Sequence, residues 1–130
     1  MLGRGRPIHL NLEQFNKLVT QALAEIPEEF LEKLENLEIV VEEEPSPDLL
    51  FELGLGKRDV LFGLYQGIPR PDKSTFQGMS LPDRITLFRN SIVGSCRSRP
   101  EVLASIKKTL VHEIAHHFGF SEKRIRQLGY

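Results

Sequence analysis

The sequence has almost none of the residues that build disulfide scaffolds, and it has no long hydrophobic run. Its single cysteine, Cys96, excludes an intramolecular disulfide, fits a reducing compartment and is expected to be a small buried apolar residue. No apolar stretch approaches the ~20 residues of a membrane-spanning helix. Residues 1–7 carry positive charge, but no hydrophobic segment follows them, so we expect no signal peptide. These features predict a cytoplasmic protein without membrane contact.

A net charge of one sign is also missing. The chain has 17 Lys and Arg residues against 18 Asp and Glu residues, which gives a formal net charge of −1. Such a balance provides no overall attraction to the phosphates of nucleic acid, so we expect no nucleic-acid partner. The length of 130 residues suits a single domain over residues 1–130 with a modest hydrophobic core.

The most informative feature that is present is the run His112-Glu113-Ile114-Ala115-His116. Two histidines four residues apart lie on one face of a helix, so both can reach one Zn²⁺ at about 2.0–2.1 Å. Glu113 follows the first histidine and would lie beside the metal, where it can take a proton from a zinc-bound water. The alternative is a helix whose histidines only form hydrogen bonds. The complete pattern favours a zinc site with its own general base.

This motif falls in the last turns of a helix that the flanking sequence predicts. Ser98 and Glu101 have the spacing of a capping box, with Pro100 in the first turn. Apolar residues then recur at helical spacing as far as Phe118, and Gly119 stands where the helix would end.

A third ligand is needed, because catalytic zinc sites usually have three protein ligands. Gly119 and Glu122 follow His116 at the spacing H-E-x-x-H-x-x-G-x-x-H, with glutamate in place of the last histidine. Glycine tolerates a positive φ, so the chain can turn back and bring Glu122 to the metal. Glu122 would otherwise be a first-turn residue of a short helix capped by Ser121. His117 lies about 100° around the helix from His116, so we expect it beside the site or on the surface.

These residues resemble the minimal zincins, a family of small bacterial metallopeptidase-like proteins related in motif to the metzincins. The resemblance rests on the motif from His112 to Glu122 and on the strand-like segments 61–69 and 81–88, and it covers most of the chain. It implies an acidic third metal ligand, usually Asp, so Glu122 is longer by one methylene. The metzincins place a methionine turn after the zinc motif, whereas the last methionine here is Met79.

The order of predicted elements indicates an α+β, zincin-like fold with a sheet of three to four strands. The expected elements are helices over residues 11–24 and 27–34, strands over 37–41, 60–66 and 84–89, the motif helix over 98–118, and a short terminal helix from 122. In zincins an edge strand above the active-site helix receives the substrate in extended form, and the second or the third strand is suited to that role. The loop of residues 67–80 would border the cleft.

The predicted function is a zinc-dependent metallopeptidase that acts on an extended peptide or protein. His112, His116 and Glu122 would hold Zn²⁺, and Glu113 would be the general base. The alternative is a zincin-like metal-binding or protein-interaction module with little or no proteolytic activity. Three side chains are candidates for stabilising the oxyanion, namely Tyr65, Tyr130 and Arg84.

Overall fold

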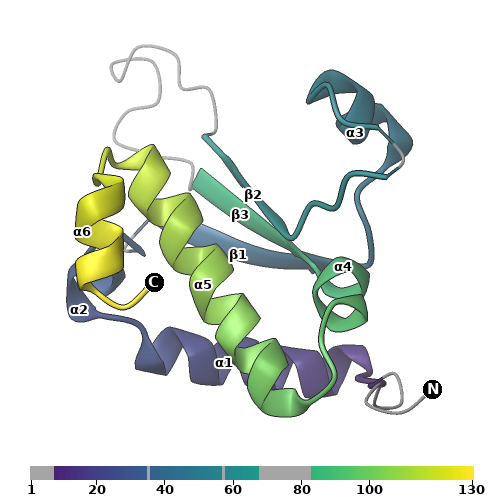
Figure 1. Cartoon of the computed structure of the whole chain (residues 1–130), viewed down its shortest axis with the longest axis horizontal. Coiled ribbons are helices and arrows are strands. Elements are labelled where there is room, and N and C mark those ends of the chain that lie inside the picture. Colours follow the sequence, from purple (N-terminus) through teal and green to yellow (C-terminus); the bar gives the residue numbers. More distant parts are fainter. Residues whose placement is uncertain (1–7, 35, 57, 68–82) are drawn as a thin grey trace, which may run out of the picture.

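The computed structural model describes residues 8–34, 36–56, 58–67 and 83–130 (Figure 1). Its elements are α1 (Leu12–Glu25), α2 (Glu28–Leu31), the 3-10 turn η1 (Glu32–Leu34), β1 (Leu37–Glu42), α3 (Pro47–Glu52), β2 (Gly63–Gln66), β3 (Asp83–Phe88), α4 (Arg89–Gly94), α5 (Arg99–His117) and α6 (Glu122–Gln127). The fold is therefore α+β, as the sequence predicts.

The described strands form one mixed sheet with the order β1-β3-β2. Strand β1 pairs with β3 in parallel, and β2 pairs with β3 antiparallel, so β3 is central and β2 is an edge strand. Three of the last four residues of β3 are large buried apolar side chains, Ile85, Leu87 and Phe88. Helix α5 crosses the sheet and packs against α1 and β2 (Figure 1). The motif helix therefore lies beside β2, an edge strand of the sheet that the described residues form.

Helix α5 supplies much of the hydrophobic core. Of the apolar positions predicted at helical spacing, Val102, Ile106, Leu110 and Ile114 have no solvent-exposed surface. Leu103 is half-buried, and Phe118, at the end of the stripe, is 40% exposed. Cys96 is also buried, as expected for a small apolar residue. Because this stripe fixes the rotation of the helix about its axis, it also fixes which residues of the zinc motif face outward.

The helix starts follow the predicted side-chain caps. Asn11 caps α1 in a reciprocal capping box with Gln14. Ser98 accepts a hydrogen bond from the backbone N–H of Glu101 at the start of α5, and Ser121 caps α6 in the same way. These hydrogen bonds satisfy N–H groups that have no partner within the helix.

Two short helices were not predicted. Helix α3 begins after Ser46, which caps it, and it has no buried residue, so it extends away from the core (Figure 1). Helix α4 begins at Arg89, where the third strand was expected to end. Each has six residues, which is too short for an apolar stripe to show as a period in the sequence. No helix among the described residues is long and apolar enough to cross a membrane.

Candidate metal centre

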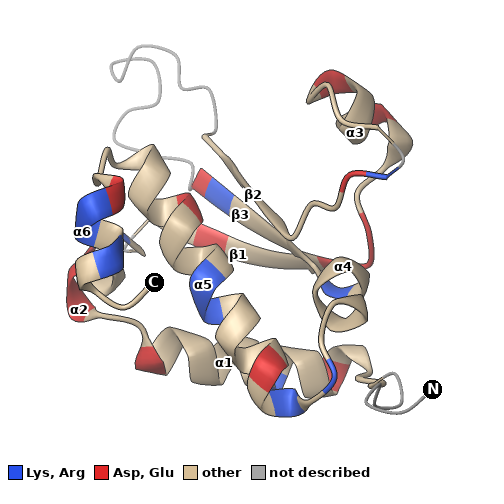
Figure 2. Ribbon diagram, viewed as in Figure 1, with Lys and Arg blue, Asp and Glu red and all other residues tan. Residues whose placement is uncertain are grey.

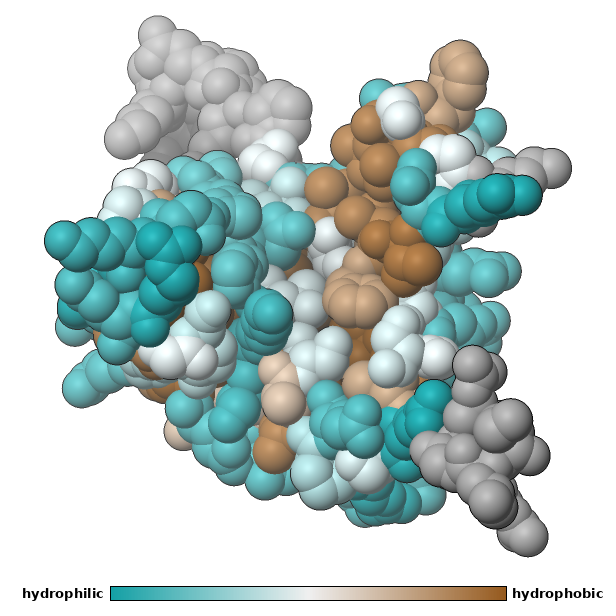
Figure 3. All heavy atoms as spheres, viewed as in Figure 1, coloured by the Kyte–Doolittle hydropathy of each residue, from teal (hydrophilic) through white to brown (hydrophobic). Residues whose placement is uncertain are grey.

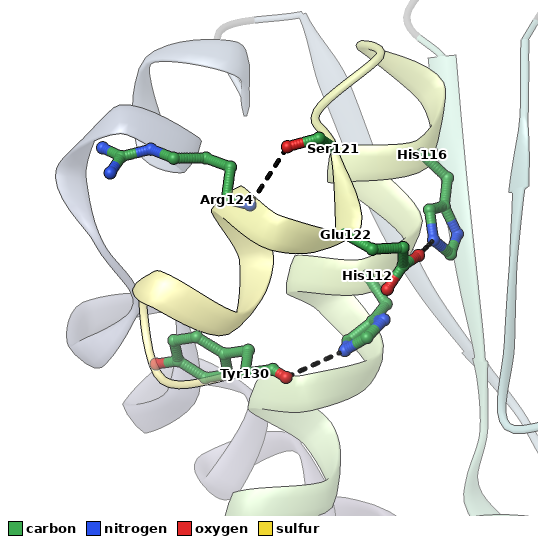
Figure 4. Close-up of polar contacts among 6 residues, drawn as sticks. All are labelled: His112, His116, Ser121, Glu122, Arg124 and Tyr130. Atoms are coloured by element: carbon green, nitrogen blue, oxygen red, sulfur yellow. Dashed lines mark hydrogen bonds and ion pairs between the residues drawn. The ribbon is translucent and has the colours of Figure 1, made fainter.

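Three side chains with metal-binding atoms meet where α5 ends and α6 begins (Figure 4). His112 and His116 come from one face of α5, and Glu122 comes from the first turn of α6. One potential ligand atom from each residue lies within 4.8 Å of the other two. His116 Nε2 lies 2.8 Å from Glu122 Oε1. The structure thus brings together the three residues that the sequence assigns to a metal.

The turn between α5 and α6 explains why Glu122 reaches the histidines. Gly119 has a φ of +77°, and the N–H of Phe120 donates to the carbonyl of Ala115 at 2.8 Å, which is a Schellman-type helix end. The ring of Phe120 packs on Phe30, with ring centroids 5.0 Å apart. The backbone reversal and this apolar contact direct α6 back along α5.

Glu122 is both a first-turn residue and a partner of the histidines. Ser121 caps α6 by accepting a hydrogen bond from the N–H of Arg124 at 3.0 Å. The contact with His116 is the largest cause that lowers the pKa of the Glu122 carboxyl, so this group is held in its ionised, ligating form. The two interpretations of Glu122 that the sequence left open are therefore compatible.

The donor set fits zinc in its chemistry and in its size. Two imidazole nitrogens and one carboxylate oxygen form a His₂Glu set, which is a common catalytic zinc arrangement. Ligand atoms around a tetrahedral zinc with bonds of about 2.1 Å are roughly 3.4 Å apart, which is closer than the 4.8 Å limit here. The side chains of His116 and Glu122 are 54% and 60% exposed, so rotations about their side-chain bonds can close this difference. His112 Nε2 lies 3.4 Å from the carbonyl oxygen of Tyr130.

Glu113 lies on the sheet side of the same turn of α5. It is half-buried, and its carboxylate accepts a hydrogen bond from the backbone N–H of Tyr65 in β2. Burial raises the pKa of the Glu113 carboxyl, and this effect outweighs the opposing effects of the Tyr65 N–H, His116 and His112. The expected general base is therefore tied to the edge strand, beside the ligands.

A groove with a volume of about 310 Å³ runs along α5 to these residues. One wall is the chain of residues 60–63, which leads into β2. The other wall is formed by Ser105, Lys108, Thr109, His112, Glu113 and His116 of α5. In Figure 3 apolar surface extends from the α3 region into the hollow beside α5. The three candidate ligands thus lie at one end of an elongated groove.

Gly63 permits a close approach of the two walls. A Cβ atom at this position would lie 2.7 Å from Cγ2 of Thr109 and 3.1 Å from the carbonyl oxygen of Thr86. Real Cβ atoms essentially never lie within 3.0 Å of another atom, so β2 and α5 can be this near only because residue 63 has no side chain.

His117 belongs to a second cluster, which the sequence did not reveal. Its ring stacks on Tyr65 with a centroid distance of 3.8 Å, and its Nε2 lies 3.8 Å from Oδ2 of Asp83. The Tyr65 hydroxyl donates to the same Asp83 oxygen at 2.9 Å. The only sequence signal was His117 itself, because Tyr65 and Asp83 become neighbours only through strand pairing. This cluster joins the end of α5 to the edge of the sheet.

The three residues proposed as oxyanion donors differ in the groups that they face. The hydroxyl of Tyr65 faces Asp83, and Nε of Arg84 pairs with Glu38 at 3.2 Å. The ring of Tyr130 is turned away from His112, toward which its backbone oxygen points (Figure 4). The loop expected to border the cleft lies, from residue 68 onward, outside the described residues.

Comparison with known proteins concerns the fold and the family of the chain. In a search of solved structures the chain is similar to a conserved hypothetical protein from T. thermophilus, with 23% sequence identity and a TM-score of 0.55, over 84% of this chain and 94% of that one. This likeness concerns the fold. A comparison with curated proteins gives no match. A family model for zincin-like metallopeptidases matches residues 34–130, which include the sheet, the motif helix and α6. The chain therefore belongs to the family of zincin-like metallopeptidases.

Proposed function

We propose that the protein is a zinc-dependent metallopeptidase that hydrolyses peptide bonds in an extended substrate. One observation carries this proposal: a convergent His₂Glu donor set lies beside a half-buried carboxylate at the end of a groove. A metal site with a structural role alone needs no general base beside it and no open groove leading to it.

The roles of the residues follow from their positions. His112, His116 and Glu122 hold the metal. Zinc, when bound, lowers the pKa of a water molecule and polarises a substrate carbonyl. The carboxylate of Glu113 accepts a proton from the attacking water and then passes it to the leaving nitrogen. Its raised pKa supports both transfers, because a general base works best when its pKa is close to the working pH.

Strand β2 is the surface to which we assign the substrate backbone. In an antiparallel ladder, alternate residues direct their N–H and C=O groups toward the partner strand and away from it. The N–H of Phe88 donates to the carbonyl of Phe62, so these two residues form a hydrogen-bonded pair next to the pair of Gly63 and Leu87. Gly63 and Tyr65 therefore direct their backbone groups outward. The Tyr65 N–H already reaches Glu113 on that side. A peptide paired with this edge would pass next to the general base.

A digestion of an unbiased library of ten-residue peptides tests the proposal. The wild-type protein and Glu113→Gln would each be loaded with one equivalent of zinc, and cleavage products would be identified by mass spectrometry. We expect the wild type to cleave and Glu113→Gln to be slower by about 10²–10⁴-fold at equal zinc content. Cleavage that does not depend on Glu113 would overturn the mechanism.

The second candidate is a zinc-binding interaction module. It is favoured by the exposed apolar side chains Phe51 (85% exposed) and Val60 (64% exposed), which are typical of contact surfaces. Stoichiometric zinc without cleavage of any library peptide, together with a loss of thermal stability on chelation, would support this module. A cytoplasmic location suits both candidates, because the buried Cys96 forms no disulfide.

A further inference from the structure

The two walls of the groove differ in chemistry. The wall formed by Val60, Leu61 and Phe62 is apolar, whereas the facing residues of α5 before the zinc motif, Ser105, Lys108 and Thr109, are polar. Val60 is 64% exposed, although it is an apolar residue beside the site. An occupant that matches this groove would present an apolar surface on one side and a polar or charged surface on the other.

Lys108 is the charged residue of the polar wall. It lies four residues before His112 and therefore about one turn along the same face of α5. It is exposed, and within the described ranges no ion pair to it is found. Its neighbour Lys107, by contrast, pairs with Glu25 at 3.1 Å and joins α5 to α1. Lys108 also lines a second hollow, next to Tyr130.

The groove has the length of a short extended peptide. Ser105 and His112 are seven residues apart on α5, which corresponds to about 10 Å, or roughly three residues of a β-strand. Neighbouring side chains of a strand point to opposite sides. A peptide that pairs with the edge of β2 therefore directs one side chain toward the apolar wall and the next toward Lys108.

The direction of β2 sets the direction of a peptide that pairs with it in antiparallel fashion. Strand β2 and helix α5 run the same way along the groove, because Gly63 lies next to Thr109 and Tyr65 next to Glu113. A peptide antiparallel to β2 passes the general base and then continues toward residues 60–62. Its residues in that part of the groove are C-terminal to the bond beside Glu113.

We propose that the preferred substrate carries a large apolar residue and an acidic residue at neighbouring positions C-terminal to the cleaved bond. The apolar side chain lies against Val60 and Phe62, and the carboxylate pairs with Nζ of Lys108. This inference rests on the proposed function for the location of the cleaved bond, but the binding preference can be measured without catalysis.

Binding to the zinc-loaded Glu113→Gln protein separates the two questions. The probes are fluorescein-labelled ten-residue peptides with Leu-Asp, Leu-Lys or Ser-Asp placed on the C-terminal side of a central Ala-Ala, and a matched set with the pairs on its N-terminal side. We expect Leu-Asp on the C-terminal side to bind roughly two- to fivefold more tightly than Leu-Lys, as suits one exposed ion pair. We expect Leu-Asp also to bind more tightly than Ser-Asp.

Two further substitutions test which wall of the groove causes each binding preference. Lys108→Glu should make Leu-Lys the tighter ligand, and Val60→Ser should remove the advantage of Leu-Asp over Ser-Asp. Lys17→Glu, which changes an exposed lysine of α1, is the matched control and should leave both preferences unchanged. Equal binding of the Asp and Lys peptides, a preference that survives Lys108→Glu, or a preference only in the N-terminal set would overturn the inference. If the wild type cleaves peptides but shows no such preference, only this inference is wrong. If the preference is found but the wild type cleaves nothing, only the proposed peptidase function is wrong.

Discussion

The two sides of the last turns of α5 are built in different ways. On the side of α6, the contact between His116 and Glu122 joins two exposed side chains. On the side of β2, the half-buried Glu113 is held by a backbone N–H, and Gly63 brings the strand into close contact with the helix. The first side can adjust to a metal by side-chain rotation, whereas the second fixes Glu113, the proposed general base, relative to the sheet. The position of Glu113 therefore tolerates less variation than the positions of the three candidate ligands.

The charged groups on the two sides of α5 also differ in their effect on stability. An exposed pair such as His116 and Glu122 adds little to stability, so either side chain can turn toward a metal at little cost to the fold. The half-buried carboxylate of Glu113 is unfavourable for stability at neutral pH, because desolvation raises its pKa. Groups that are placed at a cost to stability are typical of functional sites. Figure 2 shows that α6 consists largely of charged residues, whereas most of α5 is uncharged.

The largest predicted effect on the sheet side comes from Gly63→Ala. The added methyl group would lie 2.7 Å from Thr109, so β2 and α5 must separate. We expect the free energy of unfolding to fall by about 1–3 kcal/mol, measured by urea denaturation. Gly94→Ala is the control, because a Cβ there meets no atom within 4 Å. A loss as small for Gly63→Ala as for Gly94→Ala would show that the strand does not need this close approach.

A smaller effect is expected for Tyr65→Phe. This change removes the hydrogen bond to Asp83 but keeps the ring that stacks on His117. We expect a loss of about 0.5–1.5 kcal/mol in stability and a kcat within a few-fold of the wild type. If instead kcat fell by two orders of magnitude with little loss of stability, the hydroxyl would act on the substrate and the contact with Asp83 would not be its main role.

The smallest effect is a pH-dependent gain of stability in zinc-free Glu113→Gln. Because the pKa of Glu113 is raised in the folded protein, the folded state holds this proton at pH values where the unfolded state has lost it. The contribution of Glu113 to the free energy of unfolding therefore falls as the pH rises from the ordinary carboxyl pKa of about 4.3 through the raised pKa of the folded protein. We expect Glu113→Gln to have a slightly higher Tm than the wild type at pH 7 with a chelator present. The difference should vanish near pH 4, and a lower Tm for the variant at pH 7 would contradict the direction of the shift.

Some features could be predicted from the sequence because they have a local cause. The caps Asn11, Ser98 and Ser121 and the apolar stripe of α5 each rest on residues a few positions apart, and the structure has the caps and the stripe as far as Ile114. The same holds for Gly119, whose positive φ brings α6 back along α5. The α+β fold and the zincin-like family followed from these elements and the zinc motif.

Other features depend on pairing between distant segments and could not be predicted. The sequence left open whether the second or the third strand is the edge, and only the order β1-β3-β2 identifies β2. The hydrogen bond from Tyr65 to Glu113 and the stacking of His117 on Tyr65 follow from that order. The short helices α3 and α4 were missed because neither shows an apolar period, and the third strand was expected one residue too late as a result.

The most direct test of the metal centre is the zinc affinity of single variants, measured by competition with a chromophoric chelator at constant pH. The wild type should bind one equivalent of zinc. His116→Ala and Glu122→Ala should each weaken binding by at least about tenfold, since each removes one of the three proposed ligands. His117→Ala, which changes the neighbouring histidine that faces Tyr65, should stay within about twofold of the wild type. An unchanged affinity for Glu122→Ala, or a loss for His117→Ala as large as that for His116→Ala, would contradict a site made by α5 and α6.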